Sequence, residues 1–296
     1  MRLLKTTCLL LATLAMLAFA SCSQKEGKDT DAAQSITVFC GSASKPAMEK
    51  IAPLFERETK IKVNLIFGGS GTLLSQIQLS KQGEIYLPGS PDYILIANNK
   101  KLLIENSDRI VSYLVPAIIT PKDNPANIQS LEDLTKPGTR VGIGNPETVC
   151  LGLYSIELLE KNGLMEKVLD NVVTFGASCS KTANLAAMNQ LDAILGWRVF
   201  HHWNQERMDV VSISPEKIPR ISYIPISIPI HTKDIALSNR FIDFVLSTKG
   251  QAIYEQLGYI AQEREAKTFA PDASIGGKYT LSNTYFDFIK KHWQNK

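Results

Sequence analysis

The sequence has almost no excess of either charge. Its 296 residues carry 32 lysines and arginines against 29 aspartates and glutamates, a formal net charge of +3. Two of the positive charges, Arg2 and Lys5, lie in an N-terminal segment that we expect to be removed and that holds no negative charge, which leaves +1. Binding to nucleic acid calls for a strongly basic face, so this balance argues against a nucleic-acid partner.

Catalytic motifs are missing as well. The chain has no Gly-x-Ser-x-Gly nucleophile turn, no His-Glu-x-x-His zinc motif and no two carboxylates that share one apolar pattern. We therefore expect a protein that is not an enzyme and that needs no cofactor. His201 and His202 are adjacent, so their side chains diverge on a helix, and we expect no metal site there.

Cysteine is scarce. Of the five cysteines, Cys8 lies in the N-terminal segment and Cys22 directly follows it, which leaves Cys40, Cys150 and Cys179. Three thiols allow at most one disulfide among them. Each lies in or beside a candidate ligand loop, so together they could bind a soft metal or form a redox pair. We favour buried small side chains, or one structural disulfide, because neighbouring loops alone do not bring sulfurs within bonding reach.

No apolar run is long enough to cross a membrane, and we find no transmembrane segment after the N-terminus. Residues 1–21 have the features of a secretion signal, with a basic start and an apolar run, Leu9–Phe19, too short to cross a bilayer. The signal ends in small residues before Cys22, which resembles a bacterial lipoprotein box. We expect Cys22 to carry a lipid that anchors the exported chain at the periplasmic face of a membrane. Residues 22–35 are polar and are expected to form a flexible tether.

Short apolar strands alternate with helical patterns along the rest of the chain, which is typical of a parallel α/β architecture. Serine-rich loops at 41–44, 68–71 and 89–90 each follow an expected strand. Ligands collect at the carboxyl ends of such strands, so these loops should crowd one edge of the sheet. In the first helix, Pro53 should cause a kink or an interruption. Ser90 either faces a ligand cleft or caps the helix that begins at Pro91, and we favour the cap.

The stretch Phe67–Leu74 reads FGGSGTLL and lies where an expected strand passes into a helix. Glycine lets the backbone approach a ligand closely. Ser70 is predicted to be the N-cap, which leaves helical N–H groups and its own hydroxyl available to a small anion. A nucleotide loop would need lysine after Gly71, and Thr72 stands there instead. An ordinary capped helix explains the same residues equally well.

The α/β pattern restarts in the middle of the chain. Two long apolar segments, Val111–Thr120 and Ser222–Ile230, are candidate strands that cross between two lobes. Between them, the loop 144–152 opens one helix, and Ser178 is expected to cap another. The sequence therefore predicts lobe 1 at 36–115 plus 225–259, lobe 2 at 116–224, and a C-terminal extension at 260–296.

Several of these segments resemble the molybdate/tungstate-binding proteins of bacterial ABC importers. The similar segments are VFCGSASKPAMEKIAPLFERET, IKVNLIFGGSGTLLSQI, RVGIGNPETVCLGLYSIELLEKNGL, QLDAILGW and FIDFVLSTKGQAIYEQLGY. The resemblance covers roughly residues 36 to 259. It implies a type II periplasmic binding fold, with two α/β lobes joined by two crossing strands and a cleft between them.

In that family, serine hydroxyls and backbone N–H groups hold a tetrahedral oxyanion. Ser70 falls at the position of the second-loop serine. The first-loop serine falls at Ala43, and either neighbour, Ser42 or Ser44, could supply the hydroxyl instead. The resemblance thus implies a site that keeps the anion-binding plan of the family, with one serine hydroxyl supplied from a neighbouring residue.

The resemblance also implies donors from the second lobe. Backbone N–H donors fall near Leu151 and near Lys181, both at expected helix starts. The tyrosine hydroxyl of the family falls near Val199, which cannot supply it. Arg198 stands next to it and is either a charged ligand group or a surface residue.

The function that follows is an oxyanion carrier. We expect a lipid-anchored, monomeric solute-binding protein that captures molybdate or tungstate and delivers it to an ABC permease. The same fold binding sulfate or phosphate is one alternative. A membrane-tethered sensor or interaction protein is another, because the extension 260–296 lies outside the resemblance.

Overall fold

The computed structural model describes residues 34–293. The expected signal, the lipidated Cys22 and nearly all of the tether lie outside these residues. No helix among residues 34–293 is long and apolar enough to cross a membrane.

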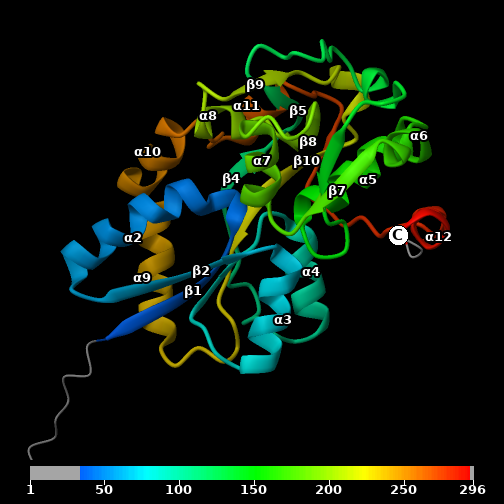
Figure 1. The fold of residues 1–296 in the computed structure, drawn as a ribbon. Coiled ribbons are helices and arrows are strands. Elements are labelled where there is room, and N and C mark those ends of the chain that lie inside the picture. Colours follow the sequence, from blue (N-terminus) through cyan, green and yellow to red (C-terminus); the bar gives the residue numbers. More distant parts are fainter. Residues whose placement is uncertain (1–33, 294–296) are drawn as a thin grey trace, which may run out of the picture. The chain divides into compact units, whose positions relative to one another are not determined.

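The first sheet contains three parallel strands in the order β2-β1-β3 (Figure 1). Its strands are β1 (Ser35–Gly41), β2 (Lys62–Gly68) and β3 (Ile85–Leu87). The helices of this half are α2 (Lys45–Thr59), α3 (Ser70–Ser80), α4 (Pro91–Asn99), α9 (Ile235–Leu246) and α10 (Thr248–Gln256). Of the two effects expected of Pro53, a kink or an interruption, the interruption is absent, because α2 continues through this residue.

The second sheet contains five strands in the order β7-β6-β8-β5-β9, of which β6, β7 and β8 are parallel and β5 is antiparallel to its neighbours. Its strands are β5 (Pro116–Pro121), β6 (Val141–Gly144), β7 (Val172–Gly176), β8 (Ala193–Trp197) and β9 (Met208–Val211). The helical segments of this half are η2 (Glu132–Thr135), α5 (Cys150–Lys161), α6 (Met165–Asp170), α7 (Cys179–Ala187), α8 (Phe200–Trp203) and η3 (Pro215–Lys217). The short η1 (Ser42–Ser44) follows β1 in the first half.

The two predicted crossing segments differ from expectation in detail. The apolar run 111–120 forms two strands, β4 (Arg109–Leu114) and β5, instead of one. β4 pairs antiparallel with β10 (Arg220–Ile226), whereas β5 enters the second sheet. The ladder between β4 and β10 is irregular at Pro225, because proline has no N–H to donate to a ladder.

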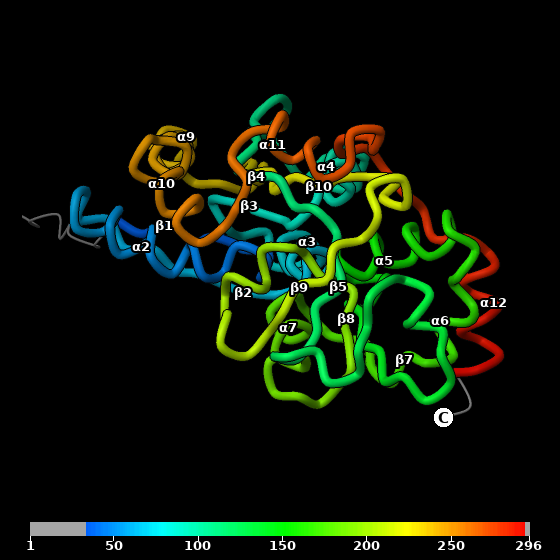
Figure 2. Tube along the Cα trace, turned by 90° about the horizontal axis from the view of Figure 1, so that it is seen from above, coloured from blue at the N-terminus to red at the C-terminus, as the bar shows by residue number. Residues whose placement is uncertain are grey.

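The extension after residue 259 folds onto the second half. It contains α11 (Glu263–Lys267), β11 (Ser274–Ile275) and α12 (Asn283–His292). β11 pairs with β10, and α12 lies beside α6 in both views (Figures 1 and 2). Tyr285 and Phe288 of α12 belong to the same hydrophobic cluster as Ile118 and Ile143 of the second sheet. The extension therefore completes this core.

Candidate functional site

The first serine loop lies directly after β1, and Ser42, Ala43 and Ser44 are all buried. The Ser42 hydroxyl accepts a hydrogen bond from the backbone N–H of Ser180, with 3.1 Å between Oγ and N. The Tyr259 hydroxyl donates to the carbonyl of Ala43. Ser42 therefore reaches the second half of the molecule, while Ala43 is fixed through its backbone.

Ser70 lies at the start of α3, but it is not the N-cap that we predicted. Gly69 holds the cap position, and no side chain caps the helix. The Ser70 hydroxyl instead accepts the N–H of Gly89 at 3.0 Å, and the Tyr86 hydroxyl donates to the Ser70 carbonyl at 2.8 Å. The side chain thus ties the second serine loop to the third and keeps its own proton for another acceptor.

Two more serine hydroxyls in these loops are buried without a hydrogen-bond partner in the described structure, those of Ser44 and Ser90. Ser90 is the N-cap residue of α4, yet its side chain makes no capping bond. The prediction that Ser90 caps this helix is wrong.

The start of α5 faces the first half. The Gly71 N–H donates to the carbonyl of Thr148 at 2.9 Å, which brings the starts of α3 and α5 together. Val149 is the N-cap and makes no side-chain cap bond, and Leu151 is the second residue of the helix. The first N–H groups of a helix have no partner within it. Leu151 therefore stands where the sequence placed a backbone donor.

The start of α7 is capped as predicted, since the Ser178 hydroxyl accepts the N–H of Lys181 at 3.3 Å. The N–H of Lys181 is thus already used within its own helix. The donor that reaches the first serine loop is Ser180, one residue earlier. The sequence could have indicated Ser180, because the second residue of a capped helix keeps a free N–H. We call Ser42, Ser70 and the helix starts at Leu151 and Ser180 the donor cluster.

Two of the three cysteines lie within the donor cluster. Cys150 and Cys179 are the first residues of α5 and α7, both are buried, and their sulfurs are 3.8 Å apart. A side chain at Gly89 would place its Cβ 2.5 Å from the Cys150 sulfur and 3.3 Å from the Ala43 Cβ, so only glycine allows this close approach. Cys150 therefore lies between the serine loops and α7.

All three cysteines are free and buried, as in the interpretation that we favoured. Cys40 makes a local contact, with its thiol 3.5 Å from the Gly41 carbonyl. Within residues 34–293, no group of three or more histidine, cysteine or acidic side chains is arranged to hold a metal ion.

The pKa of the Cys150 thiol is raised well above its usual value, first because it shares a hydrogen bond with Cys179 and then because it is buried. The nearby Ser70 hydroxyl and the Leu151 N–H act in the opposite direction but are outweighed. Cys150 is therefore a neutral thiol at physiological pH, and it adds no negative charge to the donor cluster.

Arg198 does not join the donor cluster in this structure. Its guanidinium is 3.2 Å from the Ser212 hydroxyl and lies over the ring of Phe269, 4.5 Å from the centroid. The side chain lines a polar pocket of about 400 Å³ that also contains His202. Phe269 lies in the extension, which was assigned to neither lobe from the sequence, so this stacking partner could not be foreseen. The neighbouring Val199 is buried.

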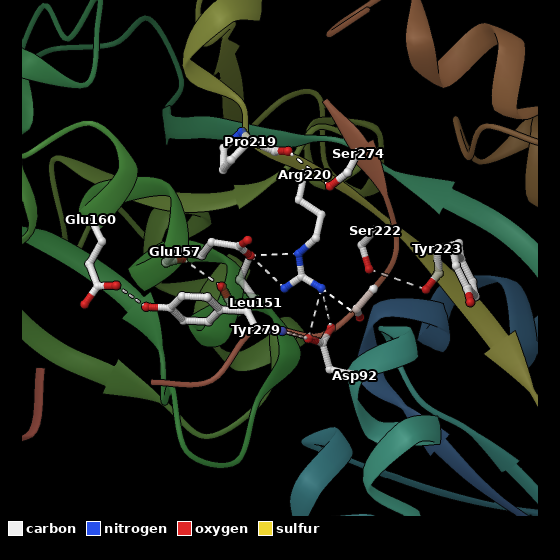
Figure 3. A network of polar contacts seen from close by, with 12 residues as sticks. Asp92, Leu151, Glu157, Glu160, Pro219, Arg220, Ser222, Tyr223, Ser274 and Tyr279 are labelled. Atoms are coloured by element: carbon white, nitrogen blue, oxygen red, sulfur yellow. Dashed lines mark hydrogen bonds and ion pairs between the residues drawn. The ribbon is translucent and has the colours of Figure 1, made fainter. Parts of the chain in front are cut away.

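A second cluster of polar residues, separate from the donor cluster, contains charged side chains and was not predicted from the sequence (Figure 3). The Arg220 guanidinium donates to Asp92 of α4 at 2.9 Å and to Glu157 of α5 at 2.7 Å. The backbone N–H of Tyr279, in the extension, donates to the same Asp92 carboxylate at 2.9 Å, and its hydroxyl donates to Glu160. We call these five residues the Arg220 network. Burial is the largest influence on Glu157 and raises its pKa, although Arg220 opposes this.

The comparisons with known proteins agree with this architecture. The sequence matches the family of bacterial extracellular solute-binding proteins over residues 36–260. The molybdate-binding protein ModA of Mycobacterium tuberculosis H37Rv is 23% identical over 239 residues, covering 78% of this chain and 86% of its own length. A sulfate-binding protein of Synechococcus elongatus is 22% identical, covering 92% of this chain and 88% of its own length.

A solved structure shares the fold. The periplasmic molybdate-binding protein of Azotobacter vinelandii superposes with a TM-score of 0.66 at 15% identity, covering 77% of this chain and all of that one. This likeness confirms the predicted α/β fold of the periplasmic binding type. The family match spans both sheets, β4, β10 and the whole donor cluster. The chain therefore belongs to the bacterial extracellular solute-binding protein family.

Proposed function

We propose that this protein binds a fully deprotonated tetrahedral oxyanion, molybdate or tungstate, at the donor cluster. The observation that carries the proposal is that two serine hydroxyls act as hydrogen-bond acceptors within the protein. Ser42 and Ser70 each accept a backbone N–H, from Ser180 and Gly89 respectively. A hydroxyl that already accepts has its single proton left to donate, and an oxyanion is an acceptor.

The electrostatics of the donor cluster support an anion that is held without a cation. The starts of α5 and α7 each contribute a partial positive charge of about half a unit, and N–H groups at helix starts bind anions. A buried counter-charge would add a desolvation cost, which neutral dipoles avoid. Because Cys150 is kept neutral, its thiol does not repel an anion.

The candidate oxyanions differ in their protonation state and in their size, and both properties bear on which of them the donor cluster would bind. Phosphate near neutral pH keeps a proton and needs an acceptor, whereas the donor cluster supplies hydroxyls and N–H groups. Molybdate, tungstate and sulfate need donors only, so phosphate is the weaker alternative. Relatives named for molybdate and for sulfate match this chain at similar identity. We favour the larger anions, on the segments that resemble molybdate/tungstate-binding proteins, and discrimination against sulfate would then rest on cavity size.

Calorimetric titration with molybdate, tungstate, sulfate and phosphate tests the proposal. We expect binding of molybdate or tungstate at micromolar concentrations and a rise in melting temperature, because a ligand that binds only the folded state stabilises it. A response to sulfate or phosphate alone would transfer the assignment to those anions. No response to any of the four would contradict the proposal.

We further propose that the protein is a lipid-anchored component of an ABC importer that acts as a monomer, a binder and not an enzyme. The anchor rests on the lipoprotein-like segment that ends at Cys22. Replacing Cys22 with alanine should release the exported protein from the membrane fraction, and an unchanged distribution would contradict the anchor. A gene neighbourhood with a permease and an ATPase would support the importer. The extension packs on the second core, which supports a structural role for it.

A further inference from the structure

Cys150 and Cys179 lie side by side at the starts of two helices, although they are distant in the sequence. β6 and β7 are neighbouring parallel strands that pair Gly144 with Gly176 at their carboxyl ends. The helices that follow, α5 and α7, therefore start side by side, and each starts with a cysteine. Their sulfurs, 29 residues apart in sequence, are in contact at 3.8 Å.

The thiols are covered from the first half of the molecule. The Cys150 sulfur lies against Gly89 and near the Ser70 hydroxyl, and Cys150 and Cys179 are only 1% and 2% exposed. The backbone contacts that close this region, such as Gly71 with Thr148, join segments from different sheets. Separation of the two halves would therefore expose both sulfurs at once, on the face that meets the anion.

We propose that Cys150 and Cys179 are a redox modification site that forms a reversible disulfide and thereby controls anion binding. The oxidant is a disulfide, such as oxidised glutathione. The two thiols give up two protons and two electrons and form one S–S bond, while the oxidant is cleaved to two thiols. An exported protein meets conditions in which such a bond persists.

The consequence for binding, which rests on the proposed function, follows from geometry. The sulfurs must approach from 3.8 Å to about 2.05 Å, which moves them relative to Ser70 and Gly89. The disulfide also has no S–H groups, so the donor cluster loses two weak donors. We expect the oxidised protein to bind molybdate about tenfold more weakly than the reduced protein.

Disulfide mapping tests the modification without any ligand. The full-length protein is treated with oxidised glutathione, free thiols are alkylated, and the chain is digested with trypsin. We expect the peptides 141–161 and 168–181 to be joined, and to separate again after reduction. Alkylated Cys150 and Cys179 after this treatment would overturn the proposal.

Titration with molybdate before and after oxidation tests control of the site. Cys150→Ser and Cys179→Ser should abolish the effect of the oxidant, whereas the Cys40→Ala control should keep it. Equal affinity of the oxidised and reduced wild-type proteins would overturn the control of binding. A chain that forms the disulfide but binds no oxyanion in either state would instead contradict the proposed function, so the two failures are distinguishable.

Discussion

The donor cluster and the Arg220 network join the same parts of the molecule, the first through neutral polar groups and the second through charged ones. Both connect the first half to α5, the donor cluster at the start of the helix and the Arg220 network along its length. At the centre of the Arg220 network, two carboxylates hold a buried cation, with side-chain exposures of 4% for Arg220, 0% for Asp92 and 11% for Glu157. The donor cluster consists of neutral hydroxyls and N–H groups.

This difference separates a structural group from the proposed ligand site. Buried charges are tolerated only when they are paired and hydrogen-bonded, and the Arg220 network meets that condition within the protein. In the donor cluster, the N–H of Ser180 already donates to Ser42, but the hydroxyls of Ser42 and Ser70 each accept a backbone N–H and keep their own proton to donate. A group whose charges are paired within the protein should govern stability, and a group with spare hydroxyl protons should govern affinity for an anion.

The largest expected effect is on stability. Arg220→Leu leaves the carboxylates of Asp92 and Glu157 buried without their cation, which should cost about 3–5 kcal/mol in the free energy of unfolding. Urea unfolding measures this cost. Lys249→Met, which removes an exposed ion pair with Glu58, is the matched control and should change stability little. Equal effects of the two substitutions would show that the Arg220 network is not a structural group.

A second test concerns the extension. Tyr285 is buried in the second core, whereas its neighbour Phe286 is 46% exposed. Tyr285→Ala should lower the free energy of unfolding by about 3 kcal/mol, because it leaves a cavity, and Phe286→Ala should have a much smaller effect. The pair is compared by denaturant unfolding. Similar small losses in both variants would mean that the extension does not complete this core.

A smaller effect is expected on affinity. Ser70→Ala should weaken oxyanion binding by about 1–3 kcal/mol, the cost of losing a hydrogen bond to a charged group. Ser75→Ala, on the exposed face of the same helix, should leave affinity unchanged. Calorimetry on both variants, after their folding is checked by circular dichroism, gives the comparison. Unchanged affinity in Ser70→Ala would remove Ser70 from the site.

The smallest expected effect is that of pH. A thiol with its ordinary pKa would ionise as the pH approaches 9, and its negative charge would repel the anion and weaken binding. Because the pKa of Cys150 is raised, the thiol stays protonated through this range, and the affinity for a dianion should be nearly constant between pH 6.5 and 9. Titrations at several pH values measure this dependence. A steep loss of affinity above pH 8 would indicate an ionised thiol in the site.

Local sequence signals predicted the serine loops well. The order of strand, serine loop and helix was readable because each element carries its own periodicity and turn residues, and the α/β fold followed from it. The cap at Ser178 was also correct. Ser70 was misassigned as a cap, because a serine before a helix can bond either to the helix or to another loop, and only the neighbouring loops decide which. Ser90 stands at the predicted N-cap position, but its hydroxyl makes no capping bond.

Contacts between distant segments were not predictable from local patterns. The Arg220 network joins residues up to 187 positions apart, and the Cys150–Cys179 contact requires two helices to start on neighbouring strands. Arg198 was considered for the site because of its place in the sequence, but Phe269 from the extension draws its guanidinium elsewhere.

The sequence by itself determined the order of elements, the family and the polar character of the loop ends, because these depend on residue types at short spacing. Only the tertiary structure decided which of those polar groups keep a free donor. That outcome depends on which distant carbonyl, carboxylate or hydroxyl each group meets when the sheets come together, and no local pattern contains this information.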